Sequence, residues 1–111
     1  MRDSRASRIL RKLPREKAFY FFTSIGNYTG EKAASLKEFV EKTREVNVQS
    51  LEFHLHRGDF ERWTAETLED NKLADQIGRL KRLGTSGESL RDQLHLIASK
   101  RYEEQKADYS V

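Results

Sequence analysis

The alternation of apolar and polar residues predicts a short β segment near the start of the chain, followed by a series of short helices. Residues 18–25, AFYFFTSI, are dense in aromatic and β-favouring residues, and Gly26-Asn27 follows them as a turn, which is typical of a buried strand. The next residues, 28–34, can return as a second strand. A helix that begins at Pro14 is the competing interpretation, because proline suits the first turn of a helix.

From residue 35 onward the apolar residues recur at helical spacing, and residues that cap helices stand between the repeats. Ser35 and Glu38 have the spacing of a capping box, and we expect their helix to run to about Val46. Its inward face is expected to comprise Leu36, Phe39, Val40 and Val46. Asn47 is suited to cap the next helix, which should stop at Gly58 because glycine readily takes a left-handed conformation. The inward face of that helix is expected to contain Leu51, His54 and Leu55.

Two further helices are predicted from the same evidence of capping residues and apolar spacing. Asp59 is a good N-cap for the first of them. Its buried stripe is expected to be Phe60, Trp63, Thr67 and Leu68. Asp70 or Asn71 should open the second helix, and Gly84 should stop it. The inward residues of this helix are expected to be Leu73, Ile77, Leu80 and Leu83.

A last helix and the length of the chain complete the predicted fold. Thr85 and Glu88 have capping-box spacing, and the helix that follows should fray over its final residues, YEEQKADYSV. Its inward face is expected to comprise Leu90, Leu94, Ile97 and Ala98. The predicted fold is mainly α, a compact bundle of four to five short helices with one aromatic strand or small β-hairpin near the N-terminus. A chain of 111 residues makes one small domain with a modest core, so we expect no cofactor.

Positive charge is concentrated at the start of the chain. Residues 1–17 carry seven cationic and two acidic side chains, whereas the formal net charge of the whole chain is +3. We therefore divide the chain into a basic N-terminal arm, residues 1–17, and a single helical domain, residues 18–111. Cations recur in the arm at three- and four-residue spacing, at Arg5, Arg8, Arg11, Lys12 and Arg15. Such a segment can pair with the phosphates of RNA or DNA, and we expect it to do so.

Two other roles for the arm remain open. It can be a solvated tail, or it can be a helix that docks Ile9, Leu10 and Leu13 on the body. A membrane-surface helix is disfavoured, because three aliphatic residues give little apolar area. A second basic cluster can extend the same electropositive face, and it comprises Arg79, Lys81 and Arg82.

The composition bears on the compartment and on the chemistry that the chain can perform. There is no cysteine, which excludes disulfides, cysteine-ligated zinc and thiol catalysis. No run approaches the roughly 20 apolar residues of a membrane span, and the start of the chain lacks the apolar stretch of a secretory signal. We expect a cytoplasmic protein, and the high content of Lys, Glu and Arg also resembles that of thermophile proteins.

The segment from Ser50 to Trp63, SLEFHLHRGDFERW, has the highest density of residues that can bind or catalyse. His54 and His56 are two residues apart, so on a helix they point in different directions, and no metal site is expected. His54 and Asp59 can form an acid–base pair, but capping by Asp59 is the preferred interpretation, with His54 facing inward and His56 facing solvent. If the body has a specific contact patch, we expect it at His54, Arg57 and Trp63.

Several strings in the chain form a recognisable pattern: AFYFFTSIGNYTGEKAASLKEF, SLEFHLHRGDFERW and the later LADQI. They resemble an uncharacterised family of small, mainly archaeal domains with a hairpin, a SLxEF helix, a His, a DFxxW helix and an LA pair. The matching residues are Ser35, Leu36, Phe39, His54, Asp59, Phe60, Trp63, Leu73 and Ala74. The resemblance covers about residues 18–78. It implies a mostly helical domain in which the His and the DFxxW segment share one structural centre, and it implies no activity.

Taken together, these features favour a non-enzymatic binding module, without catalytic residues, that docks on nucleic acid through its basic arm. One alternative is a protein–protein interaction subunit or homodimer, favoured if Phe22, Tyr28 or Trp63 forms an exposed apolar patch. The other is a small enzyme or ligand-binding domain centred on His54 and Asp59. An open pocket that these two residues line with Arg57 and a third polar group would favour it. A His54 packed beneath Trp63, with Asp59 capping its helix, would count against it.

Overall fold

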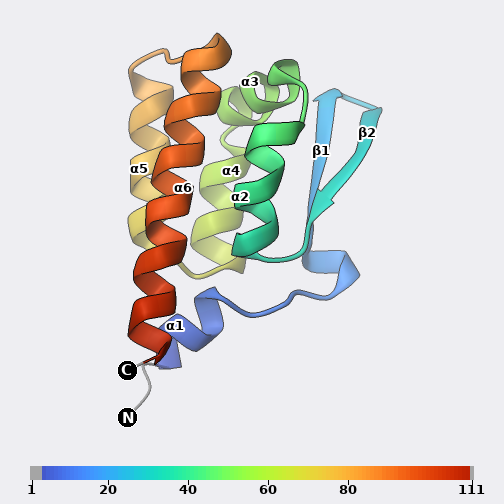
Figure 1. Ribbon diagram of the computed structural model, residues 1–111. Helices are drawn as coiled ribbons and strands as arrows, with labels where there is room; N and C mark the ends of the chain where they lie inside the picture. Colours follow the sequence, from blue (N-terminus) through green and yellow to red (C-terminus); the bar gives the residue numbers. More distant parts are fainter. Residues whose placement is uncertain (1–3, 111) are drawn as a thin grey trace.

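The computed structural model describes residues 4–110 and shows a bundle of helices with a β-hairpin on one side (Figure 1). In chain order the elements are α1 (Ser4–Ile9), a 3-10 turn (Arg15–Lys17), β1 (Phe19–Ser24), β2 (Asn27–Ala33), α2 (Leu36–Glu45), α3 (Val48–Arg57), α4 (Asp59–Arg62), a π-helix (Trp63–Thr67), α5 (Asn71–Arg82) and α6 (Gly87–Ser110). Helices α2 and α3 pack between α6 and the hairpin. The predicted fold class, mainly helical with a small hairpin near the N-terminus, is confirmed.

The hairpin confirms both the predicted strand and its return. Strands β1 and β2 pair antiparallel, with Phe22 opposite Tyr28. Gly26 takes a φ of 80° in the turn, a conformation that a side chain would strain. The competing interpretation of a helix from Pro14 is wrong, because only one 3-10 turn follows that residue.

The two faces of the hairpin carry different sets of aromatic rings. Phe19 and Phe21 face the helices and are buried, and Phe21 stacks on Phe39 of α2 with ring centroids 6.3 Å apart. On the other face Tyr20 makes an edge contact with Tyr28, which is 47% exposed. A two-stranded hairpin is marginal alone, so the rings that it buries against the helices stabilise it.

Capping residues begin and end the helices at most of the predicted positions. Ser35 accepts the backbone N–H of the third residue after it at 3.1 Å, and Asn47 that of the second at 2.8 Å. Asp70 accepts the N–H of the third residue after it at 3.2 Å. Gly58 ends α3 with a φ of 77°. Each cap satisfies a backbone group that the helix itself leaves unpaired.

Three predictions at helix ends are wrong. Thr85 does not take the N-cap position of the last helix, because α6 begins two residues later, at Gly87. Asp59 does not cap α4: the N-cap position is Gly58, which has no side-chain cap, and Asp59 contacts His54 instead. Leu83 is 71% exposed, although we expected it to face inward. Helix α5 ends at Arg82, so the residue after it leaves the buried face of the helix.

The end of the chain is also more regular than predicted. Helix α6 continues to Ser110, through the described part of the segment that was expected to fray, because tertiary contacts hold its second half. Arg101 forms an ion pair with the buried carboxylate of Asp70 at 2.8 Å, and α1 packs against the same helix. Neither α6 nor another helix among residues 4–110 is long and apolar enough to cross a membrane.

A π-helix follows α4 where the apolar spacing predicts a regular helix. The N–H of Leu68 donates to the carbonyl of Trp63, five residues earlier, at 3.1 Å. Trp63 and Thr64 are buried, but Thr67, which we expected in the buried stripe, is only half-buried and borders a pocket. Such π segments occur frequently at functional sites.

The described part of the N-terminal arm is docked on the body of the protein. Ala6 and Ile9 are completely buried where α1 packs against α6. Leu13 is also buried, and its N–H donates to the carbonyl of Ala34 at 2.7 Å. Of the roles left open for the arm, docking on the body is therefore the one that residues 4–13 adopt, as the helix Ser4–Ile9 and the non-helical residues after it. Residues 1–3 lie outside the described part of the chain.

Candidate ligand-binding site

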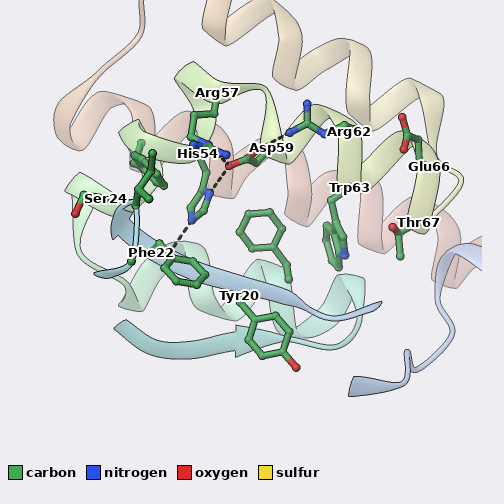
Figure 2. Close-up of a pocket in the computed structure, with 14 residues that line it drawn as sticks. Tyr20, Phe22, Ser24, His54, Arg57, Asp59, Arg62, Trp63, Glu66 and Thr67 are labelled. Atoms are coloured by element: carbon green, nitrogen blue, oxygen red, sulfur yellow. Dashed lines mark hydrogen bonds and ion pairs between the residues drawn. The ribbon is translucent and has the colours of Figure 1, made fainter. Parts of the chain in front are cut away.

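A pocket of about 500 Å³ lies between the hairpin and the corner at which α3 meets α4 (Figure 2). Strand β1 and the hairpin turn form one wall, the end of α3 forms the second, and α4 with the π-helix forms the third. Half of the lining residues are aromatic or apolar, and four polar ones, His54, Arg57, Asp59 and Arg62, form one cluster. Glu66 and Thr67 line the other side of the pocket. The structure thus places the most unusual segment of the sequence at a concave surface.

His54 lies in this pocket with both ring nitrogens engaged. The backbone N–H of Phe22 donates to Nε2 at 2.8 Å, and Nδ1 lies 2.8 Å from Oδ2 of Asp59. A backbone N–H can only donate, so Nε2 carries no proton and Nδ1–H donates to the carboxylate. The imidazole is therefore neutral, and it connects the edge of β1 to the first residue of α4.

Burial keeps this imidazole neutral. His54 is 4% exposed, and its pKa is lowered, chiefly because it is removed from water and in addition because Arg57 is nearby, while Asp59 acts in the opposite direction. The lone pair that a general base would use points at the N–H of Phe22. This geometry suits a residue that holds the pocket together better than one that accepts a proton from a substrate.

Asp59 holds two arginines at the rim of the pocket. Its Oδ2 accepts Nε–H of Arg57 at 3.1 Å, and its Oδ1 accepts from Nη2 of Arg62 at 2.6 Å. The carboxylate side chain is 16% exposed, whereas the two arginine side chains are 48% and 55% exposed. Asp59 thus anchors two guanidinium groups that remain open to solvent, and Figure 2 shows its carboxylate between them.

Aromatic rings surround the histidine on several sides. Phe19 and Phe53 contact it edge to face, with centroids 4.7 and 5.0 Å from the imidazole. The guanidinium of Arg57 lies over the ring of Phe53, 5.2 Å from its centroid, which adds a cation–π contact to the ion pair with Asp59. The rim arginine is therefore fixed from two directions.

Trp63 forms the wall of the pocket on the side of the π-helix. It is buried, its Nε1–H donates to the carbonyl of Lys17 at 2.9 Å, and its ring lies 5.5 Å from that of Phe19. Phe60 lies 5.5 Å from the imidazole of His54. The histidine and the DFxxW residues therefore do share one structural centre, as the resemblance implies.

The expected contact patch of His54, Arg57 and Trp63 is brought together at this pocket, although only the arginine is substantially exposed. Sequence reasoning missed Arg62, which is the second guanidinium at the rim. Arg62 follows Asp59 by three residues, so helical spacing alone puts both on one face and could have identified the pair. The hydrogen bond from the backbone N–H of Phe22 to His54 could not be predicted from spacing, because it joins residues that are 32 positions apart in the sequence.

The cations of the N-terminal arm lie elsewhere. Arg8 is ion-paired with Glu69 and Arg11 donates to the carbonyl of Thr67 at 2.6 Å. Lys12 is ion-paired with a glutamate of α2. The other two expected binding residues, Arg5 and Arg15, are exposed. The arm therefore presents its cations at the surface while several of them bind acidic or carbonyl groups of the body.

The second basic cluster does not extend the surface of the arm, so that expectation is wrong. Its three residues are Arg79, Lys81 and Arg82, in the last turn of α5. Figure 1 shows this end of α5 at the end of the bundle away from α1. Lys81 approaches the α3–α4 corner instead, since its Nζ would lie 3.6 Å from a Cβ added to Gly58.

The remaining histidines contribute no metal site. His56 is exposed, as expected, and His95 accompanies Thr43 at the packing of α6 against α2, with its Nδ1 3.0 Å from the hydroxyl. Within residues 4–110 no group of three or more His, Asp or Glu side chains could hold a metal ion.

Comparisons with known proteins place the chain in a family. The match is to the "Family of unknown function (DUF5752)", and it extends over residues 14–110. Neither the curated proteins nor the solved structures gave a match. The matched region begins at Pro14, after α1, and contains the whole of the pocket. Because the match covers most of its length, this chain belongs to that family of unknown function.

Proposed function

We propose that this protein is a non-enzymatic binding module and that the pocket beside His54 is its ligand site. The observation that carries the proposal is the composition of this pocket, in which two exposed arginines stand over an aromatic lining. Ligand sites typically combine a mostly apolar wall with a few well-placed polar groups. The absence of cysteine from the sequence is in keeping with a cytoplasmic location for this module.

The arrangement supports binding in preference to catalysis. A catalytic histidine needs a nitrogen that can reach the substrate, and both nitrogens of His54 already have protein partners. Both carboxylate oxygens of Asp59 likewise have protein partners already, in His54, Arg57 and Arg62. These groups hold the pocket rigid, and rigidity lowers the entropic cost of binding a ligand.

The proposal is tested by titrating the full chain with four small aromatic probes: indole, benzyl alcohol, benzoate and phenyl phosphate. Amide chemical shifts are expected to move at Phe22, His54 and Arg62 with at least one probe. Ser24→Trp places a large ring at the exposed mouth of the pocket and should abolish these shifts. Ser89→Trp, at an exposed position of α6, is the matched control and should preserve them. The proposal fails if no probe moves these amides, or if Ser24→Trp leaves the shifts intact.

A second candidate function is docking on RNA or DNA through the N-terminal cations. The burial of Ala6 and Ile9 supports it, because it fixes α1 so that Arg5 and Arg8 lie on the exposed side. Phosphate would have to compete with the ion pair to Glu69 for Arg8, which reduces the gain from each contact. Even so, the surface cations could contribute a salt-dependent attraction.

Binding to total RNA and duplex DNA over a salt series tests this second candidate. Deletion of the arm would remove buried Ile9 and Leu13, so charge removal in place is the better variant. The test variant replaces Arg5, Lys12 and Arg15 with Gln, and the control replaces the exposed Lys37, Lys72 and Lys100 with Gln. Affinity is expected to fall with salt and to fall further only in the test variant. A salt-independent result, or equal losses in both variants, would contradict it.

Self-association or a protein partner is the remaining alternative, and the hairpin supports it in one respect. Ile25 is 84% exposed at the turn and Tyr28 is 47% exposed beside it, whereas Trp63 is buried. Sedimentation of the full chain over a range of concentrations tests for a homo-oligomer. A concentration-dependent mass that Ile25→Asp abolishes would support this alternative, and a constant monomer mass would exclude self-association over that range.

A further inference from the structure

We infer that the ligand of this pocket is a small aromatic molecule with one anionic group, a carboxylate or a phosphate, that binds between Arg57 and Arg62. The inference rests on the proposed function and goes beyond it by naming the chemical class. It combines three features: a local surplus of positive charge around Asp59, free guanidinium donors and an aromatic wall.

The charge surplus follows from the groups around Asp59. Arg57 and Arg62 contribute two positive charges, and the carboxylate of Asp59 neutralises one of them. His54 adds none, because the N–H of Phe22 occupies its Nε2. The cluster of Arg57, Asp59 and Arg62 therefore carries one uncompensated positive charge, which a single anionic group would balance there. The fourth charged residue of the lining, Glu66, lies at the other side of the pocket.

The two guanidinium groups retain the donors that such an anion needs. Arg57 uses Nε toward Asp59, which leaves both of its terminal amino groups. Arg62 uses one terminal nitrogen, Nη2, which leaves Nε and Nη1. Guanidinium groups bind carboxylate and phosphate through paired N–H donors, and these contacts are stronger than neutral hydrogen bonds.

The arginines are also held in place before a ligand arrives. Asp59 binds both of them, and Phe53 supports the guanidinium of Arg57 from below. Asp59 is itself fixed by His54, which β1 holds through Phe22. Two arginines fixed in this way lose little side-chain entropy when a ligand binds. Little of the favourable energy of their contacts with an anion is therefore offset by ordering the side chains.

The rest of the lining suits a flat apolar body. Phe22, Phe53 and Trp63 face the same pocket as the arginines. Aromatic side chains favour ring ligands through offset or edge contacts. At the other side of the pocket, beyond Arg62, Figure 2 places the carboxylate of Glu66, which would repel a second anionic group there. The lining therefore favours a ring with one anionic substituent.

Five matched probes test the inference on the full chain by amide chemical-shift titration. Benzoate and phenyl phosphate carry the ring and the anion, benzyl alcohol and benzylamine carry the ring with a neutral or cationic group, and inorganic phosphate carries the anion alone. We expect the two aromatic anions to bind at least about tenfold more tightly than benzyl alcohol and benzylamine, the loss expected when a charge-assisted contact is removed. They should also bind at least about tenfold more tightly than inorganic phosphate, which lacks the ring contacts. Comparison of benzoate with phenyl phosphate distinguishes the two anionic groups.

The matched variants are Arg57→Gln, Arg62→Gln and, as control, Arg44→Gln. Arg44 is exposed to a similar extent, 53%, and its ion pair with Asp92 lies outside the pocket. We expect each pocket variant to weaken benzoate and phenyl phosphate about tenfold, with benzyl alcohol and the control unchanged. A circular dichroism melt of each variant verifies that it is folded.

The outcomes separate this inference from the proposed function. If benzyl alcohol or benzylamine binds in the pocket as tightly as benzoate, and the arginine variants have no effect, the inference fails while the ligand site stands. If inorganic phosphate binds as tightly as phenyl phosphate, the aromatic part of the inference is overturned. If no aromatic probe moves the pocket amides, the proposed function itself fails, and the inference fails with it.

Discussion

Replacement of His54 by alanine should be among the most destabilising single changes in this protein, although the residue lines a pocket. The imidazole is 4% exposed and contacts the rings of Phe19, Phe53 and Phe60. The substitution removes this packing, and it leaves the backbone N–H of Phe22 without its acceptor. Asp59 loses a donor as well.

The magnitude follows from these two losses. Truncation of a buried ring to alanine costs about 3–5 kcal/mol in protein cores, and an unsatisfied buried donor costs about 1–3 kcal/mol. The imidazole is smaller than a phenyl ring, and water can enter the open pocket to pair with Phe22, so we expect a total of about 3–5 kcal/mol. Small domains have only about 5–15 kcal/mol of stability, so this loss is a large fraction of the total.

Urea denaturation followed by circular dichroism and by the fluorescence of Trp63 measures the change. His56→Ala is the control, since this exposed residue should alter the free energy of unfolding by no more than about 0.5 kcal/mol. His54→Gln should recover part of the loss, because an amide can accept from Phe22 and donate to Asp59. A His54→Ala variant that loses less than about 1 kcal/mol would refute the reasoning, since it would show that neither the ring packing nor the hydrogen bond to β1 is significant.

Three further predictions concern stability. Burial lowers the pKa of His54, so on acidification the unfolded chain takes up a proton at a higher pH than the folded chain does, and the free energy of unfolding should fall as the pH drops below 6.5, the ordinary pKa of histidine. In urea melts at different pH values, His54→Gln should reduce this dependence on pH. Asp70→Ala removes a helix cap and leaves Arg101 without its buried partner, so it should cost about 3–5 kcal/mol in the same assay, and an effect below about 1 kcal/mol would contradict the ion pair. Ile9→Ala should cost about 2–5 kcal/mol if α1 is part of the core, and an unchanged melting temperature would show that α1 does not dock in solution.

Much of the fold could be predicted because its determinants are local. Ser35, Asn47 and Asp70 cap helices at the predicted positions, and Gly58 ends α3. Each of these residues acts on backbone groups within four residues, so the pattern of the chain contains the whole interaction. The same holds for the aromatic strand, whose alternation predicts that Phe19 and Phe21 share a face.

The candidate site could be predicted only in part. The segment that contains it was identified from its residue types, and His54 was expected to face inward. The predicted role of Asp59 as a helix cap was wrong. The local pattern favours capping, but a residue after a helix-ending glycine can also bind a side chain nearby. The structure decides for the second, since β1 supplies the donor that fixes His54 in reach of the carboxylate.

The sequence by itself determined where α2, α3 and α5 begin, where α3 ends, which strand is aromatic and which segment carries the special residues. The tertiary structure alone decided that the N-terminal arm is docked, that α6 continues to Ser110 and that two arginines stand over an aromatic pocket. The physical reason is the range of the interactions. Caps and alternation act within a few residues, whereas burial, ion pairs and the hydrogen bond from Phe22 to His54 join segments that only the folded chain brings together.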